Sequence, residues 1–96
     1  MRNTEDIIKR LLKKGQLEKA RDKAEHLDSE VMKKKCFKMI LKKDVKIGDW
    51  AEAEVVAARL NKNLTPAQVW QIIEVKVKKR DFEDLRETLE FMHDPV

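Results

Sequence analysis

Apolar residues recur along this chain at intervals of three and four, the spacing that places side chains on one face of an α-helix. Short polar segments with typical helix-capping residues separate these stretches. The pattern predicts an all-α protein with six helices, near residues 4–14, 17–27, 30–47, 50–61, 66–79 and 82–93.

The predicted helix ends carry capping signals. Thr65 is placed to cap a helix whose first residue is Pro66, and Gln68 completes a capping box. Gly48 suits the left-handed residue that ends a helix, and Asp49 is placed to cap the next one. The other capping candidates are Glu52 as the capping-box partner of Asp49, Asp81 for the last helix, Asp28 or Ser29, and Asn3 or Thr4.

One turn motif occurs three times. Each copy has a basic helix end, a glycine or arginine, a polar residue, a large apolar residue and, three positions further on, a second apolar residue. The bend residues Gly15, Gly48 and Arg80 are separated by 33 and 32 residues. This period predicts helical hairpins that stack in a single domain. The domain spans 1–96, with repeats at about 1–29, 30–63 and 64–96.

Equivalent positions of the three copies predict the core. Leu17, Trp50 and Phe82 share the first apolar position, and we expect all three to be buried. Alanines at the next positions of the first two copies would let neighbouring helices approach closely. Leu85 and Leu89 replace them in the third copy, and we expect these larger side chains to cover the end of a complete stack.

The motif resembles the tetratricopeptide repeat, over almost the whole chain. That resemblance implies a right-handed α-solenoid of three hairpins, whose first helices line a concave surface that binds peptides. The chain departs from the family pattern at Ile8, Leu41 and Ile73, where the family carries a small residue, and its second repeat is one residue short. Only Lys9 suits the family's clamp for a terminal carboxylate; the other positions hold Glu5, Met39, Trp70 and Glu74. A second resemblance, to the RNA-binding pentatricopeptide repeats, is weaker because their base-reading residues lack clear counterparts.

Charge is sorted between the predicted helices. The chain has a net charge of +4; the first helices of the three hairpins together contribute +11, and the rest of the chain contributes −7. Basic residues at helix C-termini satisfy the helix dipole and need no ligand. Lysines in the middle of the third helix have no such explanation, because like charges one turn apart are mutually destabilising. We therefore predict a partner-binding surface formed by Lys9, Lys13, Lys35, Lys38, Lys42, Lys46, Trp70 and Lys78.

These residues favour a protein–protein adaptor that binds an acidic or amphipathic segment in a basic concave groove, with Trp70 as an anchor. The alternatives are nucleic-acid binding through the same lysines, and a structural module that self-associates near Leu89 and Met92. We expect a monomer or a weak homodimer.

The sequence does not support enzymatic chemistry. The one cysteine, Cys36, lies on an apolar stripe and is expected in the core, and His26 and His93 lack metal-ligand spacing. No cofactor or metal is predicted. A single cysteine fits a reducing compartment, and no signal peptide or membrane-spanning stretch is seen, so we expect a cytoplasmic protein that does not enter membranes.

Overall fold

A computed structural model describes residues 4–92 of the chain. Each of the six predicted helices is confirmed over this range, and their ends differ from the predicted ones by at most two residues. Such differences arise because a capping residue can be counted inside or outside its helix. The helices are α1 (Thr4–Lys13), α2 (Leu17–Glu25), α3 (Glu30–Ile47), α4 (Trp50–Arg59), α5 (Pro66–Lys78) and α6 (Phe82–Met92).

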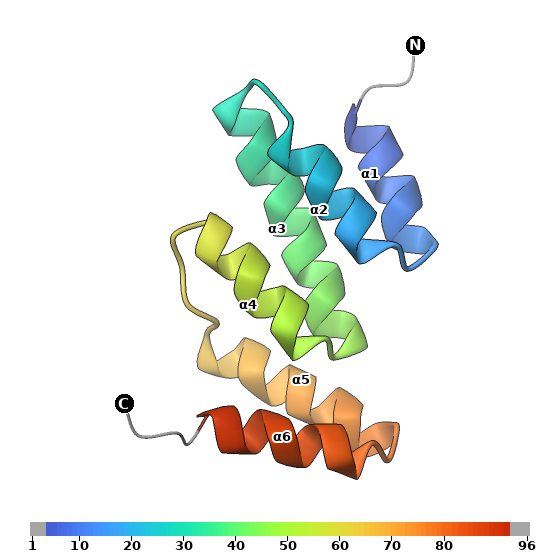
Figure 1. The fold of residues 1–96 in the computed structure, drawn as a ribbon, viewed down its shortest axis with the longest axis vertical. Helices are drawn as coiled ribbons and strands as arrows, with labels where there is room; N and C mark the ends of the chain where they lie inside the picture. The colour runs from blue at the N-terminus through green and yellow to red at the C-terminus, as the bar shows by residue number, and fades with distance from the viewer. Residues whose placement is uncertain (1–3, 93–96) are drawn as a thin grey trace.

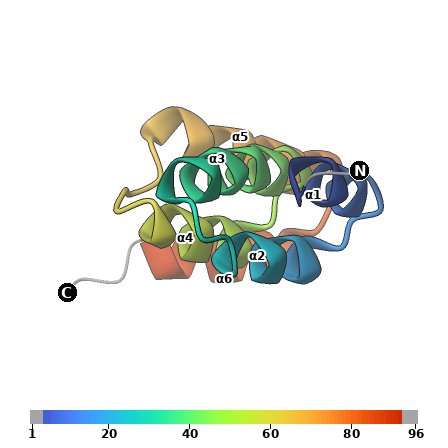
Figure 2. The ribbon, with the colours of Figure 1, turned by 90° about the horizontal axis from the view of Figure 1, so that it is seen from above.

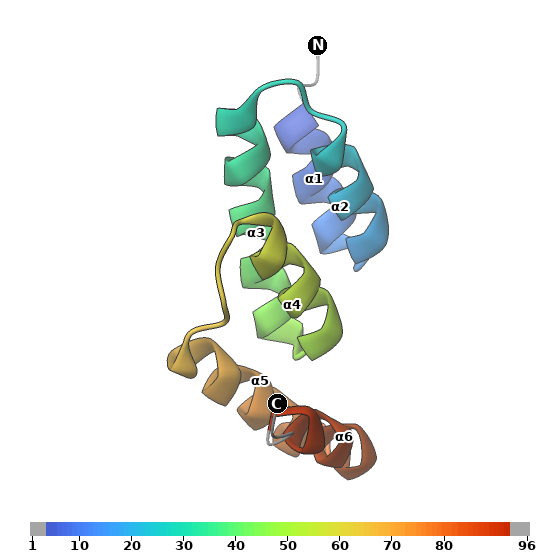
Figure 3. The ribbon, with the colours of Figure 1, turned by 60° about the vertical axis from the view of Figure 1, so that its left-hand side comes forward.

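Consecutive helices pair into three hairpins, α1–α2, α3–α4 and α5–α6, which follow one another along the long axis of the molecule (Figure 1). Seen from above, α1, α3 and α5 form one layer and α2, α4 and α6 the other (Figure 2). The helix directions turn along the chain, so that α5 and α6 lie across the long axis that α1 to α3 roughly follow (Figures 1 and 3).

The three predicted bends are the same turn. Gly15, Gly48 and Arg80 all have a left-handed backbone, with φ of 74°, 78° and 54°. In each turn the N–H of the next residue donates to the carbonyl five positions earlier, as in Gln16 to Leu11 at 2.9 Å. This is the Schellman ending of a helix, which satisfies carbonyls that the helix leaves free. The turn therefore keeps its geometry in the third copy despite the side chain of Arg80.

Among the described residues, side chains at the starts of α3, α4 and α5 cap their helices. Ser29 Oγ accepts from Met32 N at 3.3 Å, and Thr65 and Gln68 form the complete predicted capping box. Asp49 Oδ1 accepts from Glu52 N at 3.1 Å, as predicted. The return hydrogen bond predicted from the Asp49 N–H to the Glu52 side chain is wrong. The Asp49 N–H instead donates to the carbonyl of Asp44, and the carboxylate of Glu52 pairs with Arg21 of α2.

The first two hairpins enclose most of the core. Ile8, Ile40 and Val56 are fully buried, and α3 packs against α1, α2 and α4. The four alanines of the repeat motif are buried as expected: Ala20, Ala24, Ala53 and Ala57. Their small side chains allow the helix axes to approach.

The third hairpin joins this body chiefly through α5 on α3. Gly48 lies so close to α5 that a Cβ added to it would be 2.9 Å from Val75 Cγ1. Lys79 Nζ donates to the carbonyl oxygen of Ile47 at 2.9 Å. The backbone of the α3–α4 turn is therefore a central contact of this junction.

One core prediction is wrong and another holds only in part. Phe82 is 59% exposed, although its counterpart Leu17 is only 8% exposed; Trp50 is half-buried. Leu85 and Leu89 are also half-buried. The physical reason is the number of neighbouring helices: α6 packs mainly on α5, whereas α2 packs on both α1 and α3 and is therefore covered on more sides.

Candidate functional site

The lysines of α3 form a continuous exposed row. Lys35, Lys38, Lys42 and Lys46 are all exposed, and the opposite side of the helix carries its buried residues, among them Cys36, Ile40 and Leu41. A helix repeats every 3.6 residues, so steps of three and four keep the lysines in line. The predicted row on one helix face is present.

The remaining predicted residues lie on helices of the same layer. Lys9 and Lys13 are exposed on α1, and Lys78 is exposed at the end of α5. The indole of Trp70, also on α5, is 65% exposed. We call this set of eight residues the lysine face, defined as Lys9, Lys13, Lys35, Lys38, Lys42, Lys46, Trp70 and Lys78.

One carboxylate ties two helices of the lysine face together. Glu5 Oε1 lies 3.2 Å from Lys35 Nζ and 3.6 Å from Lys9 Nζ. The hydrogen bond from Lys35 is the main cause that lowers the pKa of Glu5, and Lys9 adds to it. Over residues 4–92, the five other lysines of the face have no acidic group within ion-pair distance: Lys13, Lys38, Lys42, Lys46 and Lys78.

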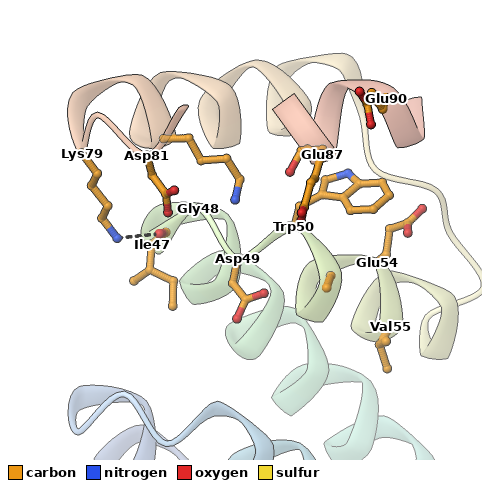
Figure 4. Close-up of a pocket in the computed structure, with 13 residues that line it drawn as sticks. Ile47, Gly48, Asp49, Trp50, Glu54, Val55, Lys79, Asp81, Glu87 and Glu90 are labelled. Atoms are coloured by element: carbon orange, nitrogen blue, oxygen red, sulfur yellow. Dashed lines mark hydrogen bonds between the residues drawn. The ribbon is translucent and has the colours of Figure 1, made fainter. Parts of the chain in front are cut away.

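A cleft that the sequence did not reveal lies on another side, between α4 and the third hairpin (Figure 4). Its volume is about 1010 Å³. Ile47, Trp50 and Val55 supply apolar surface, and no residue of the lysine face lines it. The charged residues that line it are Asp49, Glu54, Lys76, Lys79, Asp81, Glu87 and Glu90.

Carboxylates dominate one part of this α4–α6 cleft. Glu54 of α4 and Glu87 and Glu90 of α6 lie around the indole of Trp50 (Figure 4). All three glutamates are exposed. Glu90 pairs with Arg86 at 3.4 Å, whereas Glu54 and Glu87 have no ion-pair partner within the described chain. The only hint in the sequence was the acidic character of the last helix.

A partly buried charged cluster joins the first two hairpins. Arg21 of α2 contacts both carboxylate oxygens of Glu52 on α4, at 2.9 and 3.0 Å. Asp44 of α3 is fully buried beside this pair, and neither of its carboxyl oxygens has a hydrogen-bond partner among residues 4–92. Burial raises the pKa of Asp44 to about 8, with Glu52 and Asp49 adding to the shift and Arg21 opposing it.

Other reactive side chains have structural surroundings. Cys36 is fully buried, and this burial raises the pKa of its thiol. His26 Nδ1 lies 2.7 Å from the carbonyl oxygen of Asp22 at the end of α2, and His93 lies outside the described residues. Between Thr4 and Met92, no three or more histidines, cysteines or acids are grouped to hold a metal ion.

In the comparisons with known proteins, no family model, no curated protein and no solved structure matches the chain. None of its six helices, over the described range, is both long and apolar enough to cross a membrane.

Proposed function

We propose that this protein is a small adaptor of the tetratricopeptide kind, a solenoid of three hairpins that binds an acidic segment of another protein on its lysine face. One observation carries the proposal: Lys38, Lys42 and Lys46 form an exposed row with no acidic partner in the described part of the chain. Lysines one turn apart repel each other by a few tenths of a kcal/mol per pair, on the order of 0.2–0.5. An acidic ligand would turn this repulsion into attraction.

The spacing of the row suits an extended acidic segment. Four residues of α-helix span about 6 Å. Alternate residues of an extended chain are about 6.6–6.8 Å apart on one side. Carboxylates at every second position of a peptide would therefore meet successive lysines, and the exposed indole of Trp70 on α5 would hold an apolar residue of the same segment.

The test is the affinity for a fluorescent 12-residue peptide that alternates glutamate with leucine, measured by anisotropy. The Lys38→Glu/Lys42→Glu variant should weaken binding roughly tenfold or more, because each change replaces an attraction by a repulsion. The matched control is Lys19→Glu/Lys23→Glu, which makes the same charge change at the same spacing on exposed positions of α2. Equal losses in both variants would contradict the proposal.

A single-stranded RNA of the same length separates the two chemistries of the lysine face. Phosphate binding weakens steeply and linearly when the logarithm of affinity is plotted against that of salt concentration. Tighter binding of RNA than of the acidic peptide, with that salt dependence, would replace the adaptor by a nucleic-acid binder.

A further inference from the structure

We propose that the α4–α6 cleft is a second interaction site, which binds a basic amphipathic segment of another protein. This site is separate from the lysine face and has the opposite charge. Its volume of about 1010 Å³ is at the upper end of the range of ligand pockets, so it can hold several side chains of a segment.

The charges of the residues that line the cleft favour a cationic occupant. Five carboxylate residues line it against two lysines, Lys76 and Lys79. Three of these carboxylates are engaged within the chain, because Asp49 caps α4, Glu90 pairs with Arg86 and Asp81 has a contact of its own. Lys79 already donates to the carbonyl of Ile47, and Lys76 is almost fully buried and has a contact of its own. Exposed Glu54 and Glu87 lack ion-pair partners within the described residues and face solvent beside the indole of Trp50.

A comparison of equivalent repeat positions indicates which charged group the second junction lacks. At the first junction, which we define as the contact between the α1–α2 and α3–α4 hairpins, Arg21 of α2 pairs with Glu52 of α4. Shifted by one repeat along the sequence, the position of Arg21 holds Glu54 and that of Glu52 holds another acid, Asp84, so the sequence does not repeat this pair of opposite charges. A lysine or arginine from a partner would occupy the place that Arg21 takes in the first junction.

The apolar part of the cleft selects an amphipathic segment over a simple polycation. Trp50, Val55 and Ile47 offer surface for aliphatic side chains, and an arginine can also stack on the indole face. Anchors of this kind supply most of the affinity of an interface, while exposed charges around them set orientation and encounter rate.

The two tryptophans of the chain allow each site to be observed alone. A Trp70→Phe variant keeps Trp50 as the only tryptophan, so its fluorescence reports on the cleft. The probe is a 12-residue peptide without aromatic residues, with leucines at helical spacing and arginines at the other positions. We expect a saturable change in Trp50 emission, and no such change with the glutamate–leucine peptide used for the lysine face.

Variants of the rim test the charge argument. In the Trp70→Phe background, Glu54→Gln/Glu87→Gln should weaken binding of the arginine–leucine peptide about five- to tenfold. The control Glu18→Gln/Glu83→Gln removes two exposed carboxylates that do not line the cleft, and it should change affinity less than twofold. Lys38→Glu/Lys42→Glu should leave this binding intact, so a failed lysine face and a failed cleft give different results.

Three outcomes would overturn the inference. The first is an unchanged Trp50 emission at millimolar peptide, and the second is equal weakening by the rim and control variants. The third is a Trp50 emission that depends on protein concentration without peptide, with a mass that doubles by light scattering. That result would mean that a second copy of the chain occupies the cleft.

Discussion

At the first junction, α1 and α2 both pack on α3, and two ion pairs connect α2 to α4, Arg21 with Glu52 and Glu25 with Arg59. At the second, α5 packs on α3, and a cleft separates α4 from α6. The three hairpins share one internal turn, at Gly15, Gly48 and Arg80, so this turn does not determine how neighbouring hairpins pack on each other. We expect that the packing of neighbouring hairpins depends on the side chains that α2, α4 and α6 present to one another.

We expect charge to account for part of this difference. In the first junction, Arg21 of α2 pairs with Glu52 of α4, whereas the corresponding positions of the sequence one repeat later both hold acids, Glu54 and Asp84. Like charges at an interface oppose close approach, whereas opposite charges fix its register. A closed first junction would give a rigid body, and an open second junction would leave surface for a partner.

The largest expected effect concerns the buried carboxyl of the first junction. The pKa of Asp44 rises from 3.8 to about 8 on folding, so between these values the native protein holds a proton that the unfolded chain has lost. Its contribution to stability is complete below pH 3.8 and is lost as pH rises through 8. The free energy of unfolding should fall by up to about 1.4 kcal/mol per pH unit, or about 4 kcal/mol between pH 5 and 8. The raised pKa of Glu52 acts in the same direction.

Urea unfolding at pH 5 to 8.5 measures this slope, and the raised pKa of the Cys36 thiol contributes little over most of this range because an ordinary thiol keeps its proton there. Asp44→Asn should flatten the profile and be more stable than the wild type at pH 8.5. Asp28→Asn, at an exposed carboxyl, should keep the wild-type slope. A wild-type profile that is flat over this range would show that Asp44 has found a partner.

The next effect compares equivalent residues of the outer hairpins. Leu17→Ala removes a buried side chain and should cost roughly 2–4 kcal/mol of unfolding free energy. Phe82→Ala removes a larger side chain that is 59% exposed, and should cost less than about 1.5 kcal/mol. Chemical denaturation followed by circular dichroism gives both values. A greater loss for Phe82→Ala would mean that α6 packs as tightly as α2.

Local signals predicted much of this fold from the sequence. Gly15, Gly48 and Arg80 mark the bends because a helix ends through its own backbone, in the left-handed region that few residues adopt. The lysine row of α3 followed from helix periodicity alone, since its members belong to one element.

Contacts between distant elements could not be predicted in the same way. Phe82 matches Leu17 in the repeat, but its burial depends on how α6 is set against α5. The α4–α6 cleft and the burial of Asp44 likewise depend on which helices meet. The correspondence of Arg21 with Glu54 becomes informative only with the structure, which shows the Arg21–Glu52 ion pair that the sequence does not repeat at the second junction.

The smallest effect tests whether this difference in charge keeps the second junction open. Glu54→Arg restores at position 54 the cation that the first junction has at position 21, opposite the acids of α6. Exposed ion pairs contribute little, so we expect a gain of about 0.5 kcal/mol in the free energy of unfolding. Glu83→Arg makes the same charge change at an exposed position outside the cleft and serves as the control. In the Trp70→Phe background, Glu54→Arg should also reduce acrylamide quenching of Trp50 and weaken binding of the arginine–leucine peptide. Equal stabilisation by Glu83→Arg would assign the gain to net charge rather than to the junction.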